Sequence, residues 1–186
     1  TRLWRYANIV KNQNERLNRQ VEKVLQLAKI EKGNFDIKLE KINLEEVLES
    51  VEQTAILQIE KLGGTLESNW SGTGVVIIAD RLHLTNVLHN LLDNAIKFSS
   101  PHSTIQVKSQ YRGNQMIISV QDEGIGIARK HLPRLFERFY RVDKARSRAT
   151  GGTGLGLSVV HSIVSGHGGH IALESHLEQG TTFDVF

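Results

Sequence analysis

Apolar residues in the first 32 positions recur with the alternating steps of four and three that characterise a helix seam. The seam consists of Leu3, Ala7, Val10, Asn14, Leu17, Val21, Val24 and Ala28. Its single strongly polar member is Asn14, and Gly33 and Asn34 end the pattern. Heptad spacing of this length is typical of helices that pack against one another. The sequence therefore predicts a long, coiled-coil-like helix that forms a homodimer, in preference to a surface helix packed on its own domain.

After residue 34 the hydrophobic pattern alternates between the helical period and the period of two that indicates strands. Strands are predicted at 37–42, 65–69, 75–79, 104–111, 115–122, 169–175 and 181–186, and helices at 44–62, 81–98, 128–136 and 153–166. Residues 137–152 show no periodicity. This order of elements predicts an α+β fold, a two-layer sandwich with helices on one face of a mixed, mostly antiparallel sheet. We expect two units, a helix over 1–33 and a domain over 34–186.

Composition and charge narrow the range of functions. The chain contains no cysteine, which excludes thiolate zinc sites and thiol catalysis. Its net charge of +3 is unevenly distributed. Residues 129–148 contain eight basic and two acidic residues, and residues 1–32 contain eight basic and three acidic residues. Neither basic segment has the aromatic residues of a stacking platform, so we expect no nucleic-acid binding. No stretch reaches the roughly 18 apolar residues of a membrane span, and no direct membrane contact is expected.

Two asparagines stand out in the predicted helix 81–98. The apolar face of this helix consists of Leu84, Val87, Leu88, Leu91, Leu92, Ala95 and Ile96. Asn90, Asn94 and Lys97 follow one edge at helical spacing, so the two amides project to the same side. Asparagine is a poor helix former because its side chain competes for the backbone. The helix alone does not distinguish a ligand site from a solvated edge.

A carboxylate and two glycines follow the next predicted pair of strands. Met116, Ile118 and Val120 alternate onto one face of the strand 115–122, and Asp122 continues that alternation. A carboxylate directed inward requires a donor partner, because burying it unpaired is costly. Gly124 and Gly126 follow at once and permit close approach of the backbone to a ligand. A tight turn capped by an aspartate is the alternative explanation.

The third segment is rich in glycine: Gly151-Gly-Thr-Gly-Leu-Gly-Leu157 leads directly into the predicted helix 153–166. Glycine-rich backbone at a helix N-terminus presents N–H groups and the positive end of the helix dipole to phosphate. The segment lacks the lysine of a P-loop, and the chain lacks the βαβ unit of a dinucleotide fingerprint. A flexible hinge would explain the glycines but not their position next to a helix.

In this order and spacing, the three segments resemble the ATP-binding domain of sensor histidine kinases, in the GHKL superfamily. Asn90-Leu-Leu-Asp-Asn-Ala-Ile-Lys-Phe98 resembles the N box of that family, and Asp122-Glu-Gly-Ile-Gly126 resembles its G1 box. Phe136-Glu-Arg-Phe-Tyr140 resembles the F box, and Gly152-Thr-Gly-Leu-Gly-Leu157 the G2 box. The resemblance covers residues 35–186 and implies the Bergerat-type ATP-binding fold. The helix 1–33 resembles the second helix of the dimerisation and phosphotransfer hairpin.

The resemblance implies that the cofactors are ATP and Mg²⁺, with Asn90, Asn94 and Lys97 as the catalytic residues. Asn94 would bind Mg²⁺ with help from Asn90, Lys97 would meet a phosphate, and Asp122 would accept the adenine amino group. The remaining nucleotide contacts implied by the resemblance are Phe98, Gly124, Gly126, Ile127, Phe139, Arg141, Gly152, Thr153, Gly154, Leu155, Gly156 and Leu157. The expected reaction is transfer of the γ-phosphoryl group to a histidine, for relay to an aspartate of a response regulator.

Two other functions remain open. The topoisomerase and mismatch-repair ATPases of this superfamily carry a general-base glutamate one turn before the asparagine that binds Mg²⁺. This chain has Asn90 at that position, and an amide cannot usefully accept a proton from water. Steady ATP hydrolysis is therefore disfavoured. The runner-up is a serine kinase of the anti-sigma type, and a non-enzymatic alternative is a dimerising, nucleotide-sensing scaffold.

The acceptor histidine of the expected reaction is not evident in this sequence. No histidine of the chain is followed by an acidic residue or lies in the first helix. We therefore expect a fragment of a longer kinase whose acceptor histidine lies elsewhere. We expect this fragment to be cytoplasmic, and the sequence leaves open whether the whole kinase is anchored in a membrane.

Overall fold

The computed structural model describes residues 36–70, 72, 74–142 and 152–186, together with single positions between Trp4 and Val21. Its strands are β1 (Glu40–Asn43), β2 (Thr65–Trp70), β3 (Val76–Ala79), β4 (Thr104–Arg112), β5 (Gln115–Asp122), β6 (Ile171–His176) and β7 (Gly180–Val185). Its helices are α2 (Leu44–Lys61), α3 (Arg81–Phe98), the 3₁₀ helix η1 (Arg129–Arg134) and α5 (Gly156–Gly166).

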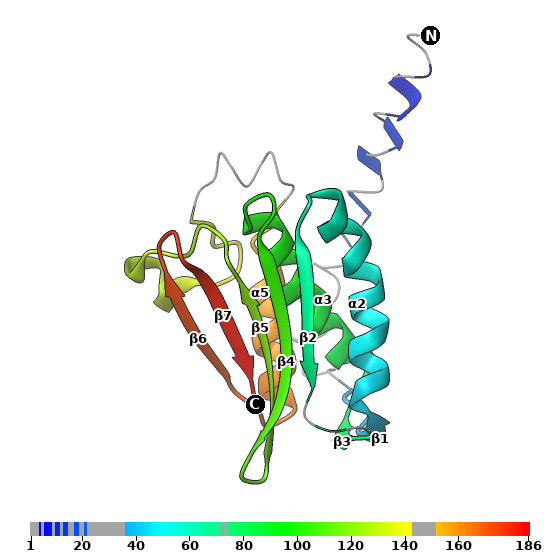
Figure 1. Cartoon of the computed structure of the whole chain (residues 1–186). Coiled ribbons are helices and arrows are strands. Elements are labelled where there is room, and N and C mark those ends of the chain that lie inside the picture. Colours follow the sequence, from blue (N-terminus) through cyan, green and yellow to red (C-terminus); the bar gives the residue numbers. More distant parts are fainter. Residues whose placement is uncertain are drawn as a thin grey trace.

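The main sheet has five strands in the order β2-β4-β5-β7-β6 (Figure 1). The pair β2–β4 is parallel, and the other three pairs are antiparallel. Strands β1 and β3 form a separate antiparallel pair at the lower end of the domain in Figure 1. The mixed, mostly antiparallel sheet predicted from the sequence is confirmed.

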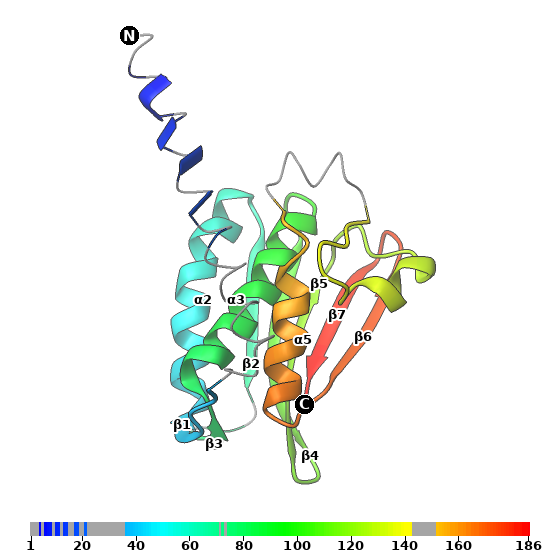
Figure 2. The ribbon, with the colours of Figure 1, turned by 180° about the vertical axis from the view of Figure 1, so that it is seen from behind.

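Helices α2, α3 and α5 cover one face of this sheet, with α3 between the other two (Figure 2). The core lies between these two layers and is formed by apolar residues from both. Its largest fully buried side chains include Leu48 in α2, Leu88 and Leu91 in α3, Ile105 in β4 and Ile163 in α5. The apolar stripe of each helix thus meets the inward alternation of the strands, as the α+β pattern predicts.

Helix α3 and strand β5 begin and end where the sequence predicts. Helix α2 begins where expected and ends one residue earlier. Strand β1 differs, because it covers 40–43 and not 37–42. The four residues of β3 pair only with Glu40–Asn43. The backbone N–H of Lys38 instead donates to a carboxylate oxygen of Asp80 at 2.9 Å.

Two predicted helices are also shorter in the structure. Over 128–136 the structure forms only a 3₁₀ helix at Arg129–Arg134, which contains Pro133, a residue with no N–H to donate. Over 153–166 the helix begins at Gly156, so the prediction was wrong for 153–155. Gly154 has a φ of +72°, outside the helical region, and the Thr153 hydroxyl accepts the Leu155 N–H at 3.3 Å.

Described positions between Trp4 and Val21 are helical, in agreement with the predicted first helix. The seam residues Val10, Leu17 and Val21 are more than half exposed in the single chain. The seam residues Leu3, Val24 and Ala28, and the predicted stop at Gly33, lie outside the described residues. Among the helices that the structure describes, none is both long enough and apolar enough to cross a membrane.

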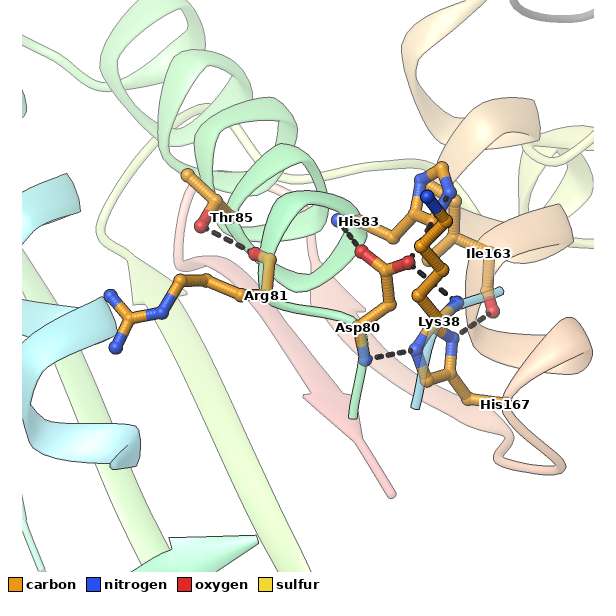
Figure 3. Close-up of polar contacts among 7 residues, drawn as sticks. All are labelled: Lys38, Asp80, Arg81, His83, Thr85, Ile163 and His167. Atoms are coloured by element: carbon orange, nitrogen blue, oxygen red, sulfur yellow. Dashed lines mark hydrogen bonds and ion pairs between the residues drawn. The ribbon is translucent and has the colours of Figure 1, made fainter. Parts of the chain in front are cut away.

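A polar cluster fixes the ends of α3 and α5 that meet beside β1 and β3 (Figure 3). Asp80 caps α3 by accepting the His83 N–H at 2.9 Å. Its own N–H donates to Nε2 of His167 at 3.0 Å, and Nδ1 of His167 lies 2.9 Å from the Ile163 carbonyl oxygen. His167 therefore carries its proton on Nδ1. Burial alone would raise the pKa of Asp80, but the backbone bonds from His83 and Lys38 and the two nearby imidazoles lower it overall.

This cluster shows how the two helices are oriented. The start of α3 lies beside the end of α5, so the two helices run antiparallel. Consequently the second half of α3 lies beside the start of α5, at the same end of the domain as the C-terminus of β5. The three segments singled out in the sequence are thereby brought to one end of the sandwich.

Candidate functional site

The asparagine edge of α3 lies between the buried core and solvent. Asn90 and Asn94 are half-buried, one turn apart, while the apolar neighbours Leu91 and Ala95 are fully buried. Lys97, the last residue but one of the helix, is exposed, and its Nζ lies 3.9 Å from Asp93. The periodicity of the helix thus places the two amides at the margin of the core, where they remain accessible from the end of the domain.

Asn90 joins α3 to the glycine-rich start of α5. Its Nδ2 donates to the Asn86 carbonyl oxygen at 2.8 Å, which fixes the orientation of the amide. Its Oδ1 lies 3.0 Å from the position that a Cβ on Gly156 would occupy. A larger residue at 156 would press on this amide. The amide of Asn90 and the glycine-rich turn are therefore close neighbours in the fold.

Asp122 ends β5 with a buried side chain that is 7% exposed. Oδ1 accepts the Gly124 N–H at 2.9 Å, and the carboxylate also accepts the N–H of Thr181. Burial raises the pKa of Asp122 from 3.8 to about 6, although both N–H bonds act to lower it. Backbone donors therefore hold the carboxylate in place, but its burial leaves it little contact with water. A buried carboxylate of this kind can accept a further hydrogen bond from a ligand.

The loop after β5 is held by backbone contacts on two sides. The Ile125 N–H donates to the Phe98 carbonyl oxygen at 3.1 Å, and a Cβ on Gly124 would collide with that same oxygen. Gly126 has a φ of +64°, and a Cβ there would collide with the His176 carbonyl oxygen. The glycines after Asp122 therefore allow the backbone to approach other backbone, which is a structural reason for them that the sequence did not reveal.

The segment that follows η1 is joined to the glycine-rich turn. The Phe139 N–H donates to the Gly154 carbonyl oxygen at 2.9 Å, and a Cβ on Gly154 would lie 2.8 Å from the Tyr140 carbonyl oxygen. The ring of Phe139 is 65% exposed, and this residue has a φ of +61°. Arg141 is half-buried. Two predicted motifs, one at 136–140 and the other at 152–157, therefore form one substructure.

Helix α5 begins without a side-chain cap. Its N-cap residue Leu155 is fully buried, and Gly152, Thr153, Gly156 and Leu157 are half-buried around it. The first turn of a helix has N–H groups with no partner inside the helix, and the positive end of the dipole lies there. This turn faces the amide of Asn90 across Gly156. The arrangement is suited to an anion such as phosphate.

Two hydroxyl residues beside Asp122 were not singled out from the sequence. Thr181 lies directly opposite Asp122 in the β5–β7 register, and Ser175 lies directly opposite Thr181 in the β6–β7 register. The Ser175 Oγ lies 2.9 Å from the Thr181 Oγ1. The sequence did contain a signal for Thr181. It alternates along the strand with the apolar residues Phe183 and Val185, which are buried, and this alternation predicts that its side chain faces inward as theirs do.

The chemistry of these residues would suit Mg·ATP. The amide oxygen of Asn90 lies next to the uncapped start of α5, and Asn94 is one turn further along α3; Mg²⁺ binds oxygen ligands while it retains several waters. Asp122 provides a buried acceptor for an amino group. Among the described residues, no group of three or more His, Asp or Glu side chains could hold a metal ion by itself.

Comparison with known proteins identifies the family. Residues 79–186 match the family model described as "Histidine kinase-, DNA gyrase B-, and HSP90-like ATPase". Over 96% of this chain, the sequence is 36% identical to the sensor protein RprX of Bacteroides fragilis. Over 96% of this chain, it is also 35% identical to the sensor histidine kinase WalK of Bacillus subtilis. It covers 35% and 29% of those proteins, respectively, so it spans about a third of the curated relatives that it matches.

Solved structures agree with this assignment. The histidine kinase AdeS of Acinetobacter baumannii matches with a TM-score of 0.78 and 27% identity over 94% of this chain and 79% of that one. Full-length ShkA in complex with AMPPNP matches with a TM-score of 0.81 and 26% identity over 97% of this chain and 37% of that one. The chain belongs to the family of histidine kinase-, DNA gyrase B- and HSP90-like ATPases, and within it to the sensor histidine kinases.

Proposed function

We propose that this chain binds Mg·ATP and transfers the γ-phosphoryl group to a histidine side chain of the same kinase, for relay to an aspartate of a response regulator. The observation that carries the proposal is the convergence of Asn90, Asp122 and Gly156 at one end of the sandwich. These residues lie on three different elements. Their shared position is suited to a ligand with an amino-bearing base at one end and phosphates at the other. ShkA, a structural neighbour, was solved with AMPPNP, an ATP analogue.

Each part of the site has a distinct role in this proposal. Asp122 accepts the exocyclic amino group of adenine. Asn94, assisted by Asn90, binds Mg²⁺, which neutralises phosphate charge when it is bound. Lys97 contacts a phosphate, and the start of α5 supplies N–H donors from Gly156 and its neighbours. The rest of the predicted set, Phe98, Gly124, Gly126, Ile127, Phe139, Arg141, Gly152, Thr153, Gly154, Leu155 and Leu157, surrounds the nucleotide.

The residue at position 90 bears on the choice between hydrolysis and transfer. Asn90 stands one turn before Asn94, and its amide cannot take a proton from water. Its Nδ2 is already committed to the Asn86 carbonyl oxygen. The domain therefore favours transfer to a positioned nucleophile over hydrolysis, and catalysis depends on bringing the acceptor in line with the phosphate.

The two segments have separate tasks in the proposal. Residues 1–33 form part of the dimerisation and phosphotransfer region, and residues 34–186 form the catalytic domain. The exposed seam residues Val10, Leu17 and Val21 support the first assignment, because an apolar seam left in solvent is suited to a partner helix. The expected partners are a second copy of the kinase and the receiver domain of a response regulator. The domain itself acts in the cytoplasm, where ATP is available.

Phosphotransfer from γ-labelled ATP tests the function directly. The chain is incubated with Mg·ATP and a separate peptide that carries the acceptor histidine of a sensor histidine kinase. Label that is lost in acid but retained in alkali indicates phosphohistidine and supports the proposal. Label that survives acid indicates the serine-kinase alternative. Tight ATP binding without transfer to any acceptor supports the nucleotide-sensing scaffold and overturns the proposal.

A further inference from the structure

One row of side chains crosses the sheet at the end of β5. In the strand registers, Asp122 lies opposite Thr181, and Thr181 lies opposite Ser175. Directly opposed residues of antiparallel strands project to the same face. Val120 and Phe183, the next pair on the same face of β5 and β7, are buried in the core under the helices, so this row faces the helical layer as well.

The hydroxyl of Ser175 is surrounded by three partners. It accepts the Ile127 N–H at 2.8 Å and donates to the Gly180 carbonyl oxygen at 3.0 Å. It also lies 2.9 Å from the Oγ1 of Thr181. A serine hydroxyl has one proton to donate and two lone pairs. The Gly180 carbonyl oxygen can only accept, so we assign the Ser175 proton to it, and this assignment makes Thr181 the donor of the bond between the two hydroxyls.

The direction of that bond determines what Thr181 offers to a ligand. With its proton turned toward Ser175, the Oγ1 of Thr181 has only lone pairs left. Asp122, directly opposite, also offers lone pairs, and its N–H partners are backbone groups of Gly124 and Thr181. The two neighbouring side chains therefore present acceptors alone. Such a pair matches an amino group and repels a carbonyl oxygen.

Ser175 also holds the loop that follows Asp122. Its bond to the Ile127 N–H connects β6 to this loop. A second bond comes from the β6–β7 turn, where the Glu178 N–H donates to the Ile125 carbonyl oxygen at 2.9 Å. The hydroxyl of one residue therefore fixes both the position of the loop and the direction of the Thr181 proton. Neither effect requires Ser175 to touch the ligand.

We propose that Ser175 is a positioning residue for base selection: its hydroxyl holds the Thr181 proton away from the base, so that Asp122 and Thr181 select a purine with an amino group at position 6. This inference rests on the proposed binding of ATP. It goes further by assigning part of the selectivity to a side chain two strands away from Asp122.

The test compares ATP with inosine triphosphate, which carries a carbonyl oxygen in place of the 6-amino group. Isothermal titration measures the dissociation constants of both nucleotides, and the readout is their ratio. In Ser175→Ala the Thr181 hydroxyl is free to turn and can donate to the carbonyl. We expect the preference for ATP to fall by about 3- to 10-fold, the worth of one ordinary hydrogen bond. Ser175→Thr retains the hydroxyl and should restore the ratio.

A second pair of variants keeps the test valid if Ser175→Ala does not fold. Thr181→Val removes the other hydroxyl and should also lower the preference, while Thr182→Val, on the opposite face of β7, should leave it unchanged. A purely structural role for Ser175 would weaken both nucleotides equally and leave the ratio intact, and that result overturns the inference alone. If the wild-type chain binds neither nucleotide, the proposed function fails and the inference fails with it.

Discussion

Replacing Asp122 by asparagine measures how much the burial of this charged carboxylate lowers the free energy of unfolding. Burial raises the pKa of Asp122 from 3.8 to about 6, so the folded state holds the proton more tightly than the unfolded chain does. Wild-type stability from this group is therefore complete below 3.8 and is lost as the pH rises through about 6. The difference between the two pKa values corresponds to about 3 kcal/mol, because each pKa unit is worth about 1.4 kcal/mol.

The side-chain amide of the Asp122→Asn variant is uncharged at every pH, but its oxygen can still accept the N–H groups of Gly124 and Thr181. We expect this variant to be more stable than wild type by about 1–3 kcal/mol near pH 8, since the amide itself loses some hydration on burial. For a domain of this size the gain corresponds to roughly 3–10 °C in Tm. The gap should narrow below pH 6 and close toward 3.8.

The same variant should bind ATP more weakly. Its amide nitrogen turns a donor toward the adenine amino group, which leaves both donors without an acceptor. A hydrogen bond to a charged group is worth about 1.5–3 kcal/mol, so we expect a 10- to 150-fold loss of ATP affinity, and a similar loss in Asp122→Ala. Guanine carries a carbonyl oxygen at the corresponding position, so GTP should bind wild type poorly and lose less in Asp122→Asn.

Urea unfolding of both proteins between about pH 4 and 8 measures the stability gap, and calorimetric titration at the higher pH measures affinity. The pH dependence of the gap separates the carboxylate from ordinary repacking, because repacking would shift stability equally at all pH values. A gap that does not vary with pH, or a variant less stable than wild type at high pH, would refute the buried-charge argument. Unchanged ATP affinity would refute the role of Asp122 in reading the base.

Three further substitutions test other parts of the molecule. Asn94→Ala should weaken the binding of Mg·ATP by about tenfold or more and leave adenosine binding in the absence of metal nearly unchanged; equal losses in titrations of both ligands would make Asn94 structural. Asp80→Ala removes the acceptor of two backbone N–H groups, and we expect thermal unfolding to show a loss of about 2–4 kcal/mol. Because folding lowers the pKa of Asp80, this loss should be complete above the ordinary value of 3.8 and should shrink as the pH falls through the lowered pKa, whereas Asp80→Asn should retain part of the cap. Leu17→Glu combined with Val21→Glu should turn a dimer into a monomer in sedimentation and leave ATP affinity unchanged; a wild-type chain that sediments as a monomer would count against the seam as a dimer interface.

The extent of each element was predictable where the local pattern was strong. Helix α3 and strand β5 match the predicted ranges because long, regular periodicity leaves one arrangement that buries every apolar residue. The predictions failed at the ends of weaker segments. Residues 153–155 are not helical, because Gly154 takes a positive φ to meet the backbone of Phe139 and Tyr140, and this contact is not visible in the local sequence.

The candidate site shows the same division. Asn90, Asn94, Asp122 and the glycine-rich turn stood out in the sequence because unusual residue types interrupt otherwise apolar elements, and their roles as ligands stay predictions. The sequence indicated that Asp122 faces inward, but only the strand registers reveal Thr181 and Ser175 beside it. Serine and threonine are common in strands and turns, so their types alone carry little information about ligands.

The sequence by itself therefore determined most of the helices and strands, which of their faces are buried, and which polar residues interrupt those faces. It did not determine the short 3₁₀ helix at Arg129–Arg134, for which it predicted a longer helix. The tertiary structure decided which of these residues meet. Asp80 and His167, 87 positions apart, join the start of α3 to the end of α5, and this antiparallel packing places Gly156 against Asn90 at the other end. Local periodicity depends on each residue's near neighbours in the chain, whereas the partner of a buried polar group is set by the packing of whole elements, which no local pattern encodes.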